Sequence, residues 1–175
     1  MQPFDTALAF TLPAEGGNVN NSHDDGRETS RGVTQATYDT WRDIQKLPRR
    51  EVTMMTDAEK VAIYRDNYWT PGKCDRLPLV LAVVHFDWCV NHGVPGALKT
   101  LQKALGFTGD DVDGVPGPKT FMAVQACDPA ATAKAYNDQR RAWWNNRVQE
   151  RPDQGVFLKG ELARVDRLDA YTAAL

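Results

Sequence analysis

Apolar and polar residues alternate at helical spacing near the start of the chain. Apolar side chains recur four positions apart over residues 3–15, which predicts a short amphipathic helix with a stripe formed by Phe4, Leu8 and Leu12. Two glycines follow position 15 directly, and glycine favours a helix end because it takes the left-handed conformation without a steric penalty. Pro13 predicts a kink near residue 9 or an earlier helix end, because proline removes a helical hydrogen bond.

The pattern after residue 34 is almost entirely helical. Predicted helices start at Thr34, at a capping box formed by Thr56 and Glu59, near Leu98, at Pro118 and at Pro129, and a last amphipathic segment carries Leu162, Val165, Leu168 and Tyr171. The run from Leu79 to Val90 is apolar nearly all round, which predicts a buried central helix that is too short to cross a bilayer. A short strand is predicted over residues 32–34. The expected fold class is therefore all-α to α+β.

Composition adds limits to this picture. The 175 residues suit one domain, or one domain with a small appended lobe. With 21 basic and 23 acidic side chains, the net charge of −2 predicts no nucleic-acid partner and no stable membrane association. The basic residues Arg140, Arg141, Arg147 and Arg151 are interpreted as solvated helix faces. No basic or long apolar stretch opens the chain, so we expect a soluble, thiol-reduced cytosolic protein, and a monomer.

The cysteines do not predict a metal centre or a disulfide framework. Cys74, Cys89 and Cys127 are odd in number and widely spaced. His85 and His92 fall with Cys89 at i, i+4 and i+7 on one helix face, yet packing in an apolar helix accounts for these positions. We therefore predict no metal and no cofactor.

Candidate catalytic residues lie at the end of the first predicted helix and on the polar loop after it. Glu15 would end the helix, where the negative end of the helix dipole and apolar neighbours both favour a protonated carboxyl. Asp24 lies on the polar loop, where a carboxylate stays ionised. Such a pair fits a glycosidase, in which one carboxyl donates a proton and the other handles water or the sugar cation. Thr29 is a third candidate on the same loop.

Each of these residues also has a structural interpretation. From its local sequence, Glu15 is also consistent with a solvated residue at a helix end. Asp24 stands in a sequence that favours a turn. Thr29 either bonds the loop backbone or positions water. Asp25 and Glu28 are alternatives to Asp24 as the second carboxylate.

Further candidates lie on the predicted helices. Tyr68 and Trp69 precede a Pro-Gly loop, and they belong either to a cleft edge, where flat rings pack against sugars, or to the core. Asp87 and Asn91 are four residues apart within the central helix, so they either brace neighbouring backbone or face the cleft. Of the adjacent Trp143 and Trp144, we expect one in the core and the other exposed.

An ordered series of motifs resembles glycoside hydrolase family 108, the phage and bacterial N-acetylmuramidases. The early motifs are Glu15-Gly16-Gly17, the run from His23 to Thr34, Tyr64-Arg65 and Tyr68-Trp69. The later motifs are similar to the peptidoglycan-binding segment commonly found after that domain: Phe86-Asp87, Val90-Asn91, Gly93, Leu101-Gln102, Ala104-Leu105-Gly106, Asp113-Gly114 and Gly117-Pro118 with Thr120. Together they cover the chain from about Phe4 to about Asp166.

The resemblance implies a mainly helical, lysozyme-like fold with a small loop or hairpin lobe that carries the catalytic site. It implies a muramidase catalytic region over residues 1–72 and a helical peptidoglycan-binding region over residues 73–175, packed as one compact unit. The implied activity is hydrolysis of the β-1,4 bond between N-acetylmuramic acid and N-acetylglucosamine. Glu15, Asp24 and Thr29 would be catalytic, and Tyr68, Trp69 and Asn91 would bind substrate.

The loop spacing is also similar to that of phage lysozymes of the bacteriophage T4 type, in which eight and five residues separate a Glu, an Asp and a Thr. Here eight residues separate Glu15 from Asp24 and four separate Asp24 from Thr29, while Ser30 holds the five-residue spacing. The choice of hydroxyl stays open. The loop also departs from the family pattern, with Asp25 in place of proline and Arg27 in place of glycine.

The resemblance to phage endolysins implies synthesis in the host bacterial cytoplasm and release to the periplasm and cell wall through a holin-type lesion. The competing functional class is a non-enzymatic peptidoglycan-binding or cell-wall structural protein. Cleavage of the peptide stems by an amidase or endopeptidase is a second enzymatic alternative, which usually requires a zinc site or an activated cysteine.

Overall fold

The computed structural model describes residues 2–14, 29–30 and 32–175. Its principal helices are α1 (Pro3–Ala14), α2 (Gln35–Ile44), α3 (Asp57–Tyr64), α4 (Leu79–His92), α5 (Val94–Ala104), α6 (Pro118–Ala126), α7 (Pro129–Glu150) and α8 (Gly155–Ala173). Single turns of other helix types stand between them at η1 (Val52–Met54), η2 (Arg65–Trp69), η3 (Cys74–Arg76), η4 (Gly109–Asp111) and η5 (Pro152–Gln154). The strands β1 (Thr29–Ser30) and β2 (Val33–Thr34) form an antiparallel hairpin. The predicted mainly helical fold with a small hairpin is confirmed.

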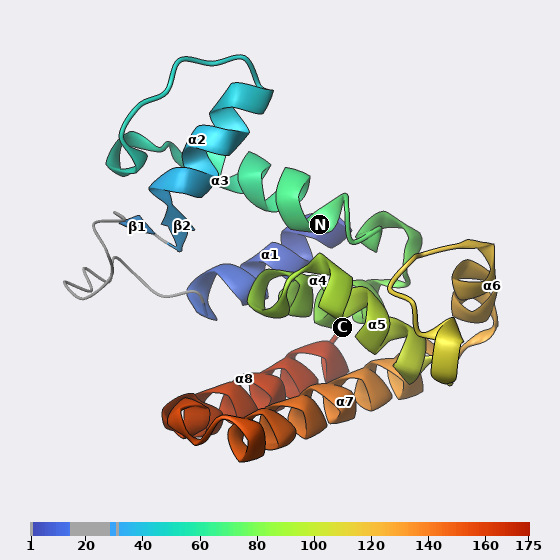
Figure 1. Cartoon of the computed structure of the whole chain (residues 1–175). Coiled ribbons are helices and arrows are strands. Elements are labelled where there is room, and N and C mark those ends of the chain that lie inside the picture. The colour runs from blue at the N-terminus through green and yellow to red at the C-terminus, as the bar shows by residue number, and fades with distance from the viewer. Residues whose placement is uncertain (1, 15–28, 31) are drawn as a thin grey trace.

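Helix α4 is the centre of the molecule. Its nine residues from Leu81 to Cys89 are all buried, as the apolar run in the sequence predicts. Helix α1 lies along one side of α4, and the antiparallel pair α7 and α8 lies along another (Figure 1). Helix α5 packs against both α4 and α7. The core therefore takes residues from the beginning, the middle and the end of the chain.

The helix starts follow the capping signals of the sequence. The Thr34 side chain caps α2 by accepting a hydrogen bond from the Thr37 amide, and Thr56 with Glu59 forms the predicted capping box of α3. Helix α1 continues through Pro13 to Ala14, so proline does not end it early. Pro13 lies in its last turn.

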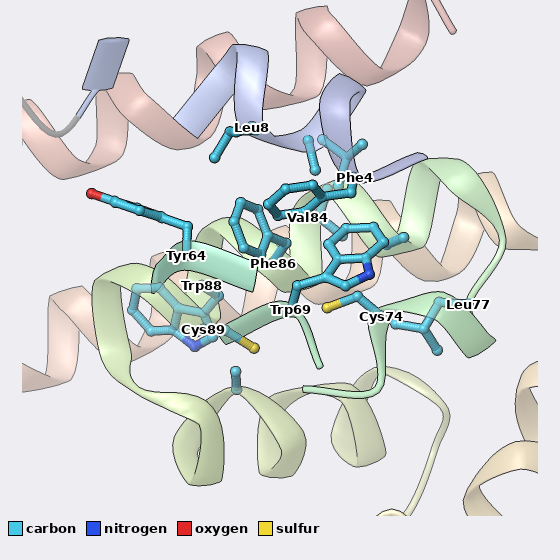
Figure 2. Close-up of a cluster of buried hydrophobic side chains, with 14 of the residues drawn as sticks. Phe4, Leu8, Tyr64, Trp69, Cys74, Leu77, Val84, Phe86, Trp88 and Cys89 are labelled. Atoms are coloured by element: carbon cyan, nitrogen blue, oxygen red, sulfur yellow. The ribbon is translucent and has the colours of Figure 1, made fainter. Parts of the chain in front are cut away.

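The aromatic core explains how α1 is held at its start. Phe4 lies edge-on to Trp69 and Phe86, with ring centroids 5.3 and 5.7 Å away, and Figure 2 shows the three rings together. Such edge-to-face pairs add about 0.5–1.5 kcal/mol to simple burial. The N-terminal half of α1 is thereby fixed on α4 and η2.

Helices α2 and α3 form a small lobe with the hairpin (Figure 1). The register pairs Thr29 with Thr34 and Ser30 with Val33. Gly32 adopts a φ of 84° between the strands, a conformation that favours glycine. Since β2 runs directly into α2, the position of the hairpin depends on the anchoring of this lobe.

Candidate active site

A buried ionic network joins the second half of α1 to α4, α7 and α8. The Asp87 carboxylate of α4 accepts a hydrogen bond of 3.1 Å from the Thr11 hydroxyl of α1. It also accepts bonds of 2.7 Å from the guanidinium groups of Arg140 on α7 and Arg164 on α8. Asp87 and Arg140 are 0% exposed, and Arg164 is 6% exposed. A buried charge is tolerated when it is paired and hydrogen-bonded, as this carboxylate is on both oxygens.

Electrostatics keeps this carboxylate ionised. Burial alone would raise the pKa of Asp87, but the charges of Arg140 and Arg164 outweigh it and hold the pKa below its ordinary value. The sequence analysis left Asp87 between bracing backbone and facing a cleft. In the structure it bonds side chains of α1, α7 and α8.

Asn91 lies one helical turn beyond Asp87. Its amide nitrogen faces the Glu161 carboxylate of α8, 3.3 Å from both oxygens. Its Oδ1 is buried and has no hydrogen-bond partner among the described residues. An unpaired buried acceptor is costly to the fold, and this atom has no exposed surface through which a glycan could reach it.

The network fixes the part of α1 that leads to the candidate acid. Thr11 stands four residues before Glu15 in the chain, and α1 ends at Ala14. Tyr171 of α8 adds a second tether, because its hydroxyl donates a 2.9 Å hydrogen bond to the Thr6 carbonyl. The backbone therefore leaves α1 from a position that α4 and α8 define.

A second network holds the lobe that carries the hairpin. Glu59 of α3 accepts hydrogen bonds from the Tyr38 hydroxyl at 3.0 Å, from Arg42 at 2.6 Å and from Arg50. Burial alone would raise the pKa of Glu59, but hydrogen bonds from Thr56, Tyr38 and Arg50 lower it to about 2. This carboxylate joins α2, α3 and the segment between them.

The predicted catalytic carboxylates lie outside the described residues. These are Glu15 and Asp24, together with the alternatives Asp25 and Glu28. Thr29 is described through its backbone, which pairs with Thr34 in the hairpin. The roles of all five remain predictions.

The two aromatic candidates separate into different environments. Trp69 is fully buried against Phe4 and Phe86, and its indole nitrogen donates a 2.6 Å hydrogen bond to Asp75. A ring with no exposed surface cannot stack on a sugar, so Trp69 is a core residue and the structure does not support it as a substrate-binding one. Tyr68 is half-buried and keeps that role as a prediction.

The basic cluster on α7 is not uniformly solvated, which corrects the sequence interpretation. Arg140 is buried on Asp87, whereas Arg141 pairs with the more exposed Asp138, Asp166 and Asp169. The sequence analysis missed Arg140 as a site residue. A signal was present, because the aromatic residues Tyr136 and Trp144 stand one turn before and one turn after it on the same helix face.

The partners on the other helices were also missed. Arg164 is followed directly by Val165 and one turn later by Leu168, both fully buried, so its position faces the core. Thr11 and Glu161 carry no comparable signal. Their contacts are set by the three-dimensional arrangement of α1, α4 and α8.

His85, Cys89 and His92 share a face of α4, but His92 lies apart from the other two. His92 stacks on Trp88 and meets Trp143, with ring centroids 4.6 and 4.3 Å away. Burial opposes ionisation of the Cys89 thiol, but a hydrogen bond from Cys74 and the charge of His85 lower its pKa to about 5. Among the described residues, Cys74, His85 and Cys89 form the one group that could hold a metal ion.

Within the described part of the chain, no helix combines the length and the apolar character that a membrane span requires.

Comparisons with known proteins give two adjacent family matches and a solved structure. The profile described as "Glycosyl hydrolase 108" matches residues 8–93, and the one described as "Predicted Peptidoglycan domain" matches residues 96–166. The structure of Brucella abortus SagA is 32% identical, with a TM-score of 0.78, over 98% of this chain and 94% of that chain. A comparison with curated proteins finds no significant match.

Proposed function

The chain belongs to glycosyl hydrolase family 108, and we propose that it cleaves the β-1,4 bond between N-acetylmuramic acid and N-acetylglucosamine in peptidoglycan. The family supports a glycoside hydrolase, and the second family match supports peptidoglycan as its partner. One structural observation carries the proposal beyond the family: the helix that leads to Glu15 is tethered at Thr11 to a buried carboxylate shared by α4, α7 and α8.

In the proposed mechanism, Glu15 is the general acid. It donates its proton to the glycosidic oxygen as the bond to the leaving sugar breaks. Its place directly after α1 supports this role, because the negative end of the helix dipole favours the protonated carboxyl. Asp24, with Thr29, stabilises the oxocarbenium-like transition state or directs the attacking water.

The tether matters because proton transfer depends on position. A general acid must lie within hydrogen-bond reach of the oxygen that it protonates, and a misplacement of about 1 Å can cost roughly 100-fold in rate. Helix α1 is held at Phe4 by aromatic packing and at Thr11 by Asp87. Both contacts belong to rigid core elements, which supports α1 as the scaffold of the acid.

Two described residues are proposed to contact the glycan. Asn91 is half-buried, and its contact with the glycan is proposed from the family resemblance. Tyr68 offers a half-buried ring suited to the C–H face of a sugar.

We further propose that the protein acts as an endolysin, as a monomer that reaches the wall after holin-type release. The family likeness motivates this role. Co-expression in a bacterial host with and without a membrane-permeabilising holin tests it, because lysis should require both proteins. Lysis without the holin would contradict this route.

Mass analysis of digested peptidoglycan tests the bond specificity. Purified walls should yield disaccharide fragments with N-acetylmuramic acid at the reducing end and intact peptide stems. Free stem peptides would indicate an amidase or endopeptidase instead. Binding to the wall with no released fragment would favour the non-enzymatic alternative.

A further inference from the structure

Three side chains of metal-binding type meet in the core, apart from the Asp87 network. Cys74 comes from η3, and His85 and Cys89 stand one turn apart on α4. Their potential ligand atoms all lie within 4.8 Å of one another, and all three residues are buried. Figure 2 shows the sulfur atoms of Cys74 and Cys89 directed toward one another.

The spacing suits a tetrahedral metal centre. The Cys89 Sγ lies 3.6 Å from the His85 Nε2. Zinc bonds of about 2.3 Å to sulfur and about 2.0 Å to nitrogen place the two ligand atoms roughly 3.5 Å apart in a tetrahedron. The observed separation therefore matches two ligands of one cation.

The two ring nitrogens of His85 have different neighbours. The Tyr136 hydroxyl donates its single proton to the Ala97 carbonyl at 3.0 Å. The His85 Nδ1 lies 3.0 Å from the same hydroxyl oxygen, so a ring proton on Nδ1 would be donated to Tyr136. The other nitrogen, Nε2, faces the Gly72 carbonyl oxygen.

With the ring proton on Nδ1, the Nε2 lone pair is available to a metal cation, and the Gly72 carbonyl oxygen lies 3.0 Å from Nε2. In the metal-free protein a proton on Nε2 is donated to the Gly72 carbonyl, and metal binding at Nε2 would replace it. A metal cation uses all three side chains. Metal-ligating histidines typically donate their other N–H to a fixed acceptor, and the Tyr136 hydroxyl lies 3.0 Å from the His85 Nδ1, where it can accept that bond.

Gly72 keeps the space beside the two sulfur atoms open. A Cβ at this position would lie 2.6 Å from the Tyr68 carbonyl oxygen, 2.9 Å from the Cys89 Sγ and 3.2 Å from the Cys74 Sγ. Gly72 is not among the described glycines with a positive φ, so space rather than backbone conformation accounts for it. Its carbonyl oxygen also faces the site and is a possible fourth metal ligand.

We propose that Cys74, His85 and Cys89 bind a thiophilic divalent cation of the zinc class. Thiolate and imidazole ligands select such metals over magnesium or calcium. Metal binding releases two protons, one from Cys74 and one from the Cys89–His85 pair, and leaves the metal bound to two thiolates and Nε2.

Burial makes this a structural centre. It would join η3 to α4 directly and, through Tyr136, would join both to α7. Residues of both family segments would then share one metal site, since Tyr136 lies in the peptidoglycan-domain match and the three ligands lie in the glycosyl hydrolase match.

The full chain, loaded with Zn²⁺ under reducing conditions and then desalted, tests the proposal by elemental analysis and native mass spectrometry. We expect one Zn²⁺ per chain in the wild type and in Cys127→Ser, a matched control whose thiol bonds the Val124 carbonyl outside the cluster. Cys74→Ser and Cys89→Ser should lose stoichiometric zinc. Loading with Co²⁺ should give thiolate charge-transfer absorption in the wild type and the control.

Tyr136→Phe keeps the buried ring and removes the hydroxyl that would accept the His85 Nδ1–H in the metal-bound protein, so it serves if the cysteine variants fail to fold. It should weaken zinc binding about 10- to 100-fold in a competition with a chromophoric chelator. A wild-type chain without zinc, a Cys74–Cys89 disulfide in the reduced preparation, or unchanged affinity in Tyr136→Phe would overturn the proposal. None of these readouts depends on wall hydrolysis.

Discussion

The hydroxyl of Thr11 donates a 3.1 Å hydrogen bond to the carboxylate of Asp87, 76 positions further along the chain. This contact ties the last turns of α1 to the central helix. Through Arg140 and Arg164 the same carboxylate reaches α7 and α8. The segment that leads to Glu15 is therefore positioned by helices from the opposite end of the chain.

Thr11→Val tests whether this tether positions the acid. Valine keeps the shape but removes the hydrogen bond, which should cost about 1 kcal/mol of unfolding free energy. Wall hydrolysis by fully folded protein should fall more steeply, by roughly 10-fold, because the end of α1 is less precisely held. Thr6→Val is the control, since among the described residues the Thr6 hydroxyl bonds only the Gln2 carbonyl just before α1, at 3.4 Å. Wild-type turnover in Thr11→Val would contradict the positioning role.

Asp87→Asn should destabilise the fold strongly. The substitution leaves the buried guanidinium groups of Arg140 and Arg164 without the carboxylate that they share, at a cost of about 3–5 kcal/mol. Urea unfolding measures the change. Asp138→Asn breaks only half-exposed pairs with Lys134 and Arg141, so it should change stability by about 1 kcal/mol or less. Equal effects of the two substitutions would show that the buried network contributes no more to the free energy of unfolding than the exposed pairs do.

Glu59 predicts how stability depends on pH. Its pKa in the folded protein is about 2, below the ordinary value of 4.5. Because folding lowers this pKa, the stabilisation is fully present above pH 4.5 and is lost as the pH falls toward 2. Unfolding free energies measured between these limits should show a smaller slope in Glu59→Gln than in the wild type. An unchanged slope would mean that Glu59 is not held by Tyr38 and Arg50 in solution.

Tyr68 and Trp69 should respond differently to truncation. Trp69→Ala removes a fully buried ring and the partner of Asp75, so we expect a loss of about 3–5 kcal/mol in stability. Tyr68→Ala should instead weaken glycan binding about 2- to 10-fold, as expected for one ring contact. Thermal unfolding and binding to soluble glycan fragments separate the two effects. Unchanged binding in Tyr68→Ala would remove Tyr68 from the substrate site.

Much of the helical architecture could be predicted from local sequence. The caps at Thr34 and Thr56 use side chains within three residues of the helix start, and the buried α4 shows in an unbroken apolar run. Ile44 shows the limit of such patterns. It shares the periodicity of Tyr38 and Trp41 but is 68% exposed, because a pattern does not show where the neighbouring element ends.

The site could be predicted only in part. The motif around Glu15 is local and therefore readable, whereas the partners of Asp87 come from helices more than 50 positions away. Arg140 looked like part of a solvated charge cluster because composition does not reveal which guanidinium is paired in the core. Cys74 reaches Cys89 and His85 through a turn at Gly72, which spacing along a single helix does not show.

The most direct test of the central claim is the rate at which Glu15→Gln releases reducing ends from purified peptidoglycan. Glutamine keeps the shape of the side chain but has no proton to donate, so the rate should fall at least about 100-fold while thermal unfolding stays unchanged. Glu150→Gln, at an exposed position at the end of α7, should retain the wild-type rate. A folded Glu15→Gln protein that releases reducing ends at the wild-type rate would contradict the assignment of Glu15 as the general acid.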